Sequence, residues 1–186
     1  MASNSINDFK AAFKGGGARP NQFQVTGSFP GGVVGGSEAA KLTPFLISAA
    51  SLPASTLGEI VVPYRGRQLK LAGDRTFETW NITVLNDVDF SLRNAFESWS
   101  NLISSHEGNS SALAAESYEY FQDWRIEQLS RNGDPIAEYK FIGCFPTSIG
   151  AIDVSHAASA EVESFTVALN YQYWTRRKNE PVTDGR

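Results

Sequence analysis

The strongest constraint on the fold is a strict alternation of side chains near the C-terminus, over residues 163–173. Large apolar or aromatic side chains recur at every second position from Phe165 to Tyr173. The positions between them hold small or polar side chains without charge. Successive side chains of a β-strand point to opposite faces of its sheet, so this segment predicts a strand with one buried face and one neutral polar face.

Other segments predict further strands and two helices. Alternation or turn spacing predicts strands at 21–29, 42–48, 77–85, 118–126, 137–144 and 151–154, and a hairpin of 59–64 and 67–72 around Arg65-Gly66. Apolar residues between 88 and 103 recur at three and four, which predicts the principal helix, with Asn86-Asp87 as caps. Ile6, Phe9 and Phe13 predict a short helix over 4–14.

The remaining segments are predicted to lie outside regular structure. The glycine-rich segment 30–40 is predicted to be a surface loop, and Phe145-Pro146-Thr147 to break a strand. Residues 175–186 are polar without an apolar period, so we expect a flexible C-terminal extension. Together the patterns predict one mainly β, α+β domain over residues 1–174. We expect an antiparallel barrel or sandwich of about eight strands, with the principal helix packed on the sheet.

Composition limits the function classes. The formal net charge is −4, whereas proteins that grip nucleic acid through its phosphates concentrate Lys and Arg. A single cysteine, Cys144, cannot form an internal disulfide. The N-terminus lacks the pattern of a signal peptide, and no apolar run is long enough to span a bilayer. We therefore expect a chain that is made in the cytoplasm without a membrane anchor.

No group of residues has the spacing of a catalytic, metal or cofactor site. His106 and His156 lie among small polar residues, and Cys144 is expected to be a buried, inert thiol. Gly15-Gly16-Gly17 lacks the Lys-Ser/Thr of a phosphate loop. Gly73-Asp74-Arg75 favours a tight turn with a local ion pair over an active site. We expect neither an enzyme nor a bound cofactor.

Four stretches carry a family resemblance, in the same order along the chain. They are residues 18–25 (ARPNQFQV), 71–87 (LAGDRTFETWNITVLND), 139–150 (YKFIGCFPTSIG) and the strand at 163–174. They resemble the tail tube proteins of contractile-tailed bacteriophages over about residues 5–174, and the 71–87 block is long enough to be specific. Relative to that family, residues 31–40 look like a glycine-rich inserted loop and 175–186 like an extension.

The resemblance implies a tail-tube fold whose subunits are completed in hexameric rings. Such rings stack head to tail into a hollow tube inside a contractile sheath, located in the virion tail. The tube is the conduit for genome ejection into the host. The implied partners are further copies of the chain, the tail sheath protein, and the baseplate and tail terminator proteins. Double-stranded DNA would pass through the lumen without specific binding.

Within that fold, we predict which residues line the lumen and which form contacts between subunits. The apolar faces of the strands would pack under the principal helix, and the polar faces would line the lumen. The lumen-facing candidates are Thr79, Asn81, Thr83, Ser164, Thr166, Asn170 and Gln172. The candidates for contacts between subunits are Phe9, Phe13, Arg19, Asp74 and Arg75, the last two as an ion pair.

Two other interpretations stay open from the residues. One is a tube initiator, a tube terminator or a secretion-type tube subunit of the same fold. The other is a small β-sandwich binding module whose groove is lined by aromatic side chains, namely Tyr118, Tyr120, Trp124, Tyr171 and Tyr173. Polymerisation separates the first from the second, because a binding module need not form tubes.

Overall fold

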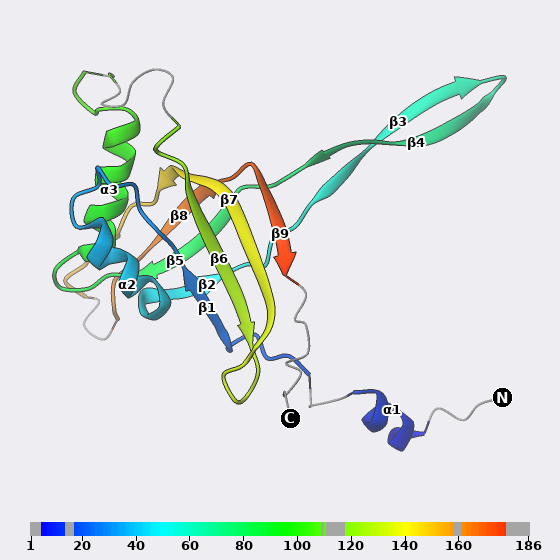
Figure 1. Cartoon of the computed structure of the whole chain (residues 1–186), viewed down its shortest axis with the longest axis horizontal. Helices are drawn as coiled ribbons and strands as arrows, with labels where there is room; N and C mark the ends of the chain where they lie inside the picture. Colours follow the sequence, from blue (N-terminus) through cyan, green and yellow to red (C-terminus); the bar gives the residue numbers. More distant parts are fainter. Residues whose placement is uncertain (1–4, 14–16, 109, 111–117, 158–160, 178–186) are drawn as a thin grey trace, which may run out of the picture.

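The computed structural model describes residues 5–13, 17–108, 110, 118–157 and 161–177. Its body is a seven-stranded sheet in which every neighbouring pair is antiparallel (Figure 1). The strands are β1 (Phe23–Thr26), β2 (Ile47–Ala50), β5 (Trp80–Leu85), β6 (Gln122–Leu129), β7 (Pro135–Ile149), β8 (Ser164–Asn170) and β9 (Tyr173–Arg177). The order is β1-β6-β7-β8-β5-β2, with β9 also on β7. The mainly β, antiparallel prediction is confirmed, although β1 and β2 do not pair to close a barrel.

The long strand β7 joins two layers of the sheet. Its first part pairs with β6 and β9, and residues 145–149 pair with β8. The predicted break at Phe145-Pro146-Thr147 is therefore wrong. Pro146 lies opposite Leu169 beside a register shift, and a proline is tolerated at such a bulge because no regular ladder bond is lost there.

The core lies between the sheet and the helix α3 (Ser91–Ile103), which is the predicted principal helix. Trp80, Trp99 and Trp124 are fully buried, together with aromatic and aliphatic side chains from β5, β7 and β8. The helix begins at Ser91, and its N-cap is Phe90, so the prediction of Asn86-Asp87 as caps is wrong. The Asp87 carboxylate nevertheless accepts from the Ser91 backbone N–H at 2.8 Å. Val88 lies before the helix and is 97% exposed, so its assignment to the apolar stripe is wrong.

A second helix, α2 (Gly36–Leu46), lies beside α3 where a loop and a strand were predicted. The loop prediction is wrong for residues 36–40, and the strand prediction for 42–46. The buried positions of α2 are Gly36, Ala39 and Thr43, which have helical spacing but small or polar side chains. The Thr43 hydroxyl donates to the Ala40 carbonyl and accepts from the Gly27 N–H. A pattern based on large apolar residues misses such a helix.

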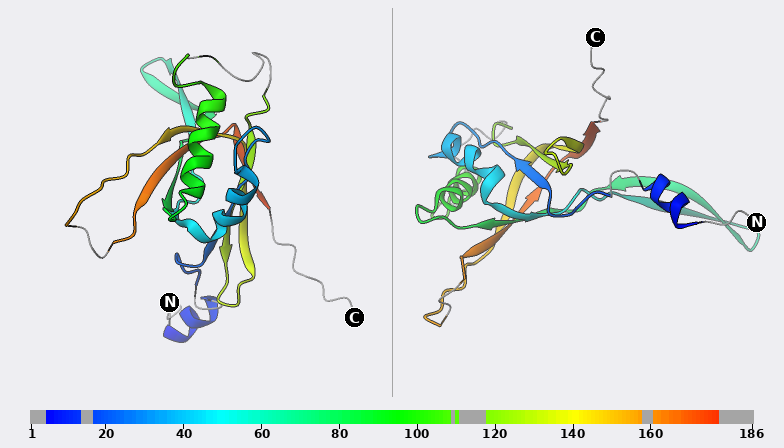
Figure 2. Two further views of the ribbon diagram at one scale, coloured as in Figure 1. Left: turned by 90° about the vertical axis from the view of Figure 1, so that its left-hand side faces the viewer. Right: turned by 90° about the horizontal axis from the view of Figure 1, so that it is seen from below.

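The strands β3 (Thr56–Tyr64) and β4 (Arg67–Thr76) form a separate two-stranded sheet that projects from the body (Figures 1 and 2). The predicted hairpin and its Arg65-Gly66 turn are confirmed, with both turn residues at positive φ. Residues 73–75 lie inside β4, so the predicted tight turn there is wrong. A register shift between Leu57 and Glu59 lies opposite them, and a Cβ on Gly58 would meet the Asp74 carbonyl oxygen at 3.1 Å.

The two ends of the described chain also bear on the predictions. The short helix α1 (Ile6–Ala12) is confirmed, with Ser5 in a capping box with Asp8, and it buries none of its residues. Thr175, Arg176 and Arg177 belong to β9 and pair with β7, so these three residues are not an unstructured extension. Residues 178–186 lie outside the described part. The predicted strand at 151–154 is not formed.

Candidate functional site

One face of the layer formed by β2, β5, β8 and the end of β7 is neutral and polar. Thr83 lies opposite Thr166, and Asn81 opposite Ala168, on adjacent strands. The Thr79 hydroxyl donates to the Asn170 Oδ1 at 2.8 Å. The structure therefore brings six lumen-facing candidates together on one face, namely Thr79, Asn81, Thr83, Ser164, Thr166 and Asn170. The predicted alternation is confirmed, because the residues between them are buried in the core.

Gln172 does not belong to this row. It lies in the connection between β8 and β9, where its backbone N–H donates to the Ile142 carbonyl at 3.0 Å. Its side chain covers Gly143, where an added Cβ would lie 3.0 Å from the Gln172 Cγ. Gly143 has a φ of 67°, so the chain bends where Gln172 packs against it.

Sequence reasoning missed four further members of this neutral face, Ser48 and Ala49 of β2 and Thr147 and Ser148 of β7. The Ser48 hydroxyl donates to the Thr83 carbonyl at 3.3 Å, and the Thr147 hydroxyl donates to the Ala168 carbonyl at 3.1 Å. They were missed because 42–48 was assigned the wrong bounds and 145–147 was assigned to a break. Alternation could not reveal them, because each pair consists of consecutive residues at a register shift.

Both edges of this layer are unpaired in the part of the chain that the structure describes. β2 pairs with β5 alone, and residues 145–149 of β7 pair with β8 alone. An exposed strand edge presents backbone N–H and C=O groups that can pair with another chain. The neutral face therefore lies between two strand edges that a neighbouring copy could extend.

The projecting hairpin has one apolar face, which consists of Ile60, Val62, Tyr64, Leu69 and Leu71. Ile60 lies opposite Leu71, and Val62 opposite Leu69. All five side chains are exposed in the single chain. The other face carries an ion pair between Lys70 Nζ and Glu59 Oε1 at 3.0 Å. A contiguous exposed apolar surface of this kind marks a contact with another protein.

The predicted intersubunit residues lie in three separate places. Asp74 and Arg75 are adjacent in β4 and point to opposite faces, and Arg75 donates to the Ser55 hydroxyl at 3.0 Å. Phe9 and Phe13 are exposed on one side of α1, with ring centroids 5.4 Å apart. Arg19 is exposed before β1, and its carbonyl accepts from the Gln128 side chain. Their role in subunit contacts stays a prediction.

Cys144 and the possible metal ligands were the residues with the most reactive side chains in the sequence. Cys144 is fully buried, and burial raises the pKa of its thiol from 9.0 to about 12. The thiol is therefore protonated and unreactive at neutral pH. In the described ranges, no group of three His, Cys, Asp or Glu side chains could hold a metal ion. Among the helices of these ranges, none has the length and apolar character needed to cross a bilayer.

The aromatic groove of the alternative binding module does not form. Trp124 is buried in the core, where its indole N–H donates to the Ser28 carbonyl at 3.1 Å. Tyr171 packs edge-on against Phe141, whereas Tyr118 stacks on Phe121 at the start of β6. Tyr118 and Tyr120 both pack on Phe121, apart from the buried Trp124, so the five aromatic side chains do not gather in one groove.

Comparison of the sequence with known proteins shows the family to which the chain belongs. The sequence profile described as "Phage tail tube protein" matches residues 18–177. The chain belongs to the phage tail tube protein family. The tail tube protein gp19 of Enterobacteria phage T4 is 31% identical over 171 residues, which are 91% of this chain and 98% of that protein. The tail tube protein of Serratia phage KSP90 is 31% identical over 169 residues, which are 90% and 94% of the two chains.

The fold agrees with this membership in the tail tube family. A chain of the six-fold symmetrised anti-feeding prophage baseplate matches with a TM-score of 0.60 at 16% identity. The match covers 88% of this chain and 97% of that one. The resemblance that the four sequence stretches carry is thereby confirmed, and so is the tail-tube fold.

Proposed function

We propose that this chain is the subunit of the inner tube of a contractile phage tail, in which six copies close a ring and rings stack head to tail. The observation that carries the proposal is the neutral polar face between two unpaired strand edges. Its family relatives are named tail tube proteins, which agrees with this assignment. The tube would be the conduit through which the genome leaves the virion.

Ring closure follows from the two free edges. The β2 edge of one subunit would pair with the β7 edge of the next, so that the layers join into one continuous sheet. A closed ring leaves no edge strand open, which removes the backbone groups that would otherwise pair with the wrong chain. The head-to-tail use of two different edges is what a cyclic assembly requires.

The neutral face would then line the lumen. It points away from α3, because the buried side chains of β5 and β8 fill the opposite side and pack against that helix. Hydroxyl and amide groups offer no cation to the DNA phosphates. Binding through phosphates depends on Lys and Arg, which release counterions, so double-stranded DNA would slide past this surface without adhering.

The outer side of the ring would carry α2 and α3. These helices cover one side of the sheet (Figure 2), and that side would face away from the lumen. We propose this outer side as the surface toward the tail sheath. The two ends of the tube would meet the baseplate and the tail terminator. No enzymatic step is required for any of these contacts.

The test is negative-stain electron microscopy of the purified protein across a concentration series, with sizing of the same samples. Hollow stacked rings of uniform width are the expected result. A discrete small oligomer that never stacks, even with a baseplate as a template, would overturn the proposal. A comparison variant has a polar hairpin face, Leu69→Ser with Leu71→Ser. It should remain monomeric under the same conditions.

A further inference from the structure

The β2 edge of the neutral layer has a side-chain pattern that a regular strand lacks. Ile47 is buried and Ala50 packs against the core, whereas the two residues between them are exposed. These two, Ser48 and Ala49, are consecutive because the pairing with β5 shifts register between Ile47 and Ala49. A bulge of this kind places two residues of one strand opposite one residue of its partner. The order of side chains along this edge is therefore core, exposed, exposed, core.

The end of β7, at the other edge of the same layer, has the same order. Pro146 is buried and Ile149 packs against the core. Thr147 and Ser148 between them are exposed, and the pairing with β8 shifts register between Pro146 and Ser148. The two edges therefore present matching stretches of four residues.

The directions of the two edge strands allow these stretches to pair. β2 is antiparallel to β5, β5 to β8, and β8 to the end of β7, so β2 and the end of β7 run in opposite directions. In one antiparallel register the core-facing residues meet, Ile47 opposite Ile149 and Ala50 opposite Pro146. The exposed residues then meet as well, Ser48 opposite Ser148 and Ala49 opposite Thr147. A slip of one residue would place Ile47 opposite an exposed residue.

A side chain lies at each end of this stretch and binds the next backbone carbonyl. Ser51 follows Ala50, and its carbonyl accepts from the Trp80 indole N–H at 2.8 Å. Gly150 follows Ile149, and its carbonyl accepts from the Arg93 guanidinium. Both carbonyls are thus bonded to the body of their own chain. Because the two edges run in opposite directions, these two contacts would lie at opposite ends of a joint between copies.

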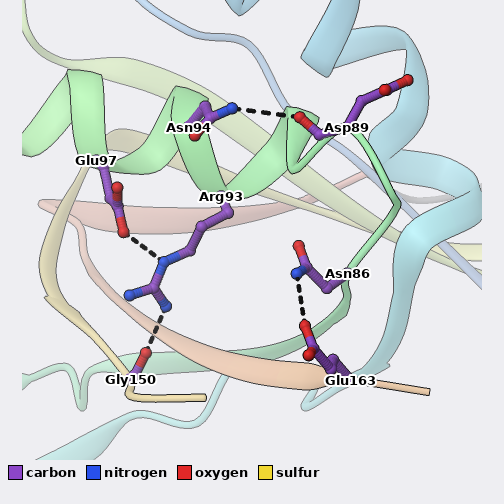
Figure 3. Close-up of polar contacts among 7 residues, drawn as sticks. All are labelled: Asn86, Asp89, Arg93, Asn94, Glu97, Gly150 and Glu163. Atoms are coloured by element: carbon purple, nitrogen blue, oxygen red, sulfur yellow. Dashed lines mark hydrogen bonds and ion pairs between the residues drawn. The ribbon is translucent and has the colours of Figure 1, made fainter. Parts of the chain in front are cut away.

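Arg93 is itself held in place by several contacts. Its guanidinium pairs with Glu97 as well as with the Gly150 carbonyl (Figure 3), and its Cζ lies 5.0 Å from the centre of the Phe165 ring. Gly150 is fixed from the other side. Its N–H donates to the Thr166 carbonyl at 2.7 Å, and an added Cβ would lie 2.6 Å from the Thr166 Oγ1. The end of the β7 edge therefore has one defined position.

We propose that Arg93 and Trp80 limit the joint between neighbouring copies to one register, with Ile47 opposite Ile149. They are positioning residues, because they act through the backbone carbonyls of Gly150 and Ser51. The inference rests on the proposed tube function and adds the residues that set the register of ring closure. A single register gives every joint the same geometry, which a closed ring of identical copies requires.

Cysteine cross-linking measures the register in assembled tubes. Ser48→Cys combined with Ser148→Cys should link neighbouring copies into a ladder under mild oxidation. The same pair cannot link within one chain, because β5 and β8 separate the two strands by roughly 14 Å, and a disulfide spans at most about 7 Å between Cα atoms. Two shifted pairs are the matched controls, Ser48→Cys with Thr147→Cys and Ala49→Cys with Ser148→Cys. Both should link several-fold more slowly, because their positions are displaced by one residue.

Arg93→Met tests the positioning role. Methionine keeps a long side chain over Phe165 but removes the donor to Gly150. The protein concentration needed for assembly should rise roughly tenfold, because the end of the edge would then be ordered only on association. In this variant the shifted cysteine pairs should link about as fast as the matched pair, which a merely stabilising role would not cause.

The matched control for Arg93→Met is Asn86→Ala. It removes a side-chain hydrogen bond of 3.0 Å to the Glu163 carboxylate, at the same end of the layer but between the inner strands β5 and β8 (Figure 3). This variant should assemble at the native concentration and keep one register. Thermal unfolding of both variants shows whether they have lost similar stability.

The outcomes separate the register from the tube function. If tubes form but the shifted pairs link as fast as Ser48 with Ser148, the single register is wrong and the tube function stands. Tubes in which no pair links would overturn the joint itself. Native assembly and native cross-linking by Arg93→Met would overturn the role of Arg93. If the native chain never forms rings or tubes, even with a baseplate as a template, the proposed function fails and this inference with it.

Discussion

The strands β5 and β8 of the body and β4 of the projecting hairpin alternate apolar with polar side chains but differ in burial. In β8, Phe165 is 2% exposed and Val167 and Leu169 are 0% exposed. In the hairpin, Ile60 is 52% and Leu69 56% exposed. Alternation therefore predicts that one face is buried, but it does not show whether the surface that buries it belongs to the same chain. For the hairpin, the proposed tube assembly offers a neighbouring subunit as the covering surface.

The difference has a physical cause in the number of layers. β8 lies between β5 and β7, and α3 covers its apolar face. The hairpin has two strands and no covering layer, and an isolated hairpin is only marginally stable in water. Its exposed Glu59–Lys70 ion pair adds little, because solvent screens it. The apolar face of the hairpin is thus still exposed to water in the monomer, so its burial on association would be favourable.

The largest expected effect is the loss of assembly when the hairpin face is made polar. In the variant Leu69→Ser with Leu71→Ser, two side chains no longer bury apolar surface between copies, at about 1.5–3 kcal/mol each. Tubes or rings should disappear from negative-stain images. The free energy of unfolding of the monomer should change by less than about 0.5 kcal/mol per site, because both positions are exposed.

The matched control for that variant is Gln68→Ser, on the opposite face of the same strand. It should assemble normally and unfold like the native chain. Normal tubes from the Leu69→Ser with Leu71→Ser variant would show that the hairpin face is not covered in the assembly. The interpretation that another copy buries the hairpin face, as the core buries β8, would then be wrong.

A second prediction compares the monomer stability that is lost when a leucine is truncated in β8 and in the hairpin. Leu169→Ala in β8 removes a fully buried side chain, so the free energy of unfolding should fall by about 2–5 kcal/mol. Chemical denaturation of the monomer measures this loss. The same substitution at Leu69 should cost the monomer less than about 1 kcal/mol. Equal losses at the two positions would mean that the hairpin packs on its own body in solution.

Most of the sheet could be predicted from the sequence because its strands bury large side chains at every second position. The 77–85 strand and the 164–170 part of the C-terminal alternation identified the neutral face correctly, whereas β8 ends at Asn170 and Gln172 lies off that face. Helix α2 could not be predicted in this way, because Gly36, Ala39 and Thr43 bury small groups against the body. The continuity of β7 through Pro146 also escaped, since proline usually ends a central strand.

The candidate surfaces were only partly predictable for a similar reason. The six predicted members of the neutral face follow from period two within single strands, whereas the four members on β2 and β7 do not. The start of the connection from β7 to β8 is held by a contact from a distant element, Arg93 with the Gly150 carbonyl, which local spacing does not encode. The projection of the hairpin likewise depends on what lies around it, because an exposed strand and a buried one can share the same alternation.

A third prediction tests the neutrality of the lumen. Thr166→Lys places one positive charge per subunit on the exposed face of β8, so a closed ring would carry a circle of cations. Tubes that form from this variant should retain double-stranded DNA at low salt and release it as salt rises. DNA co-sedimentation across a salt series measures this retention. The control is Ser98→Lys on α3, which should not retain DNA inside the tube. Equal retention by both would place Thr166 outside the lumen.

The smallest expected effect concerns the buried thiol. Burial raises the pKa of Cys144 to about 12 in the folded chain, against 9.0 when it is exposed. Both states hold the proton below pH 9, so the thiol leaves stability unchanged there. Between pH 9 and 12 the unfolded chain loses the proton first, and stability should fall with rising pH by at most about 1.4 kcal/mol per pH unit.

Thermal unfolding from pH 8 to above pH 10 can isolate this contribution by comparison with Cys144→Ala. The native chain should lose stability more steeply than the variant above pH 9. Thiol labelling extends the contrast between the two regions. Cys144 should react only as the chain unfolds, whereas a Leu69→Cys thiol on the apolar face of the hairpin should react at once in the monomer and slowly in the tube. Rapid reaction of that thiol in assembled tubes would mean that the hairpin face stays exposed, which would contradict its proposed burial by a neighbouring subunit.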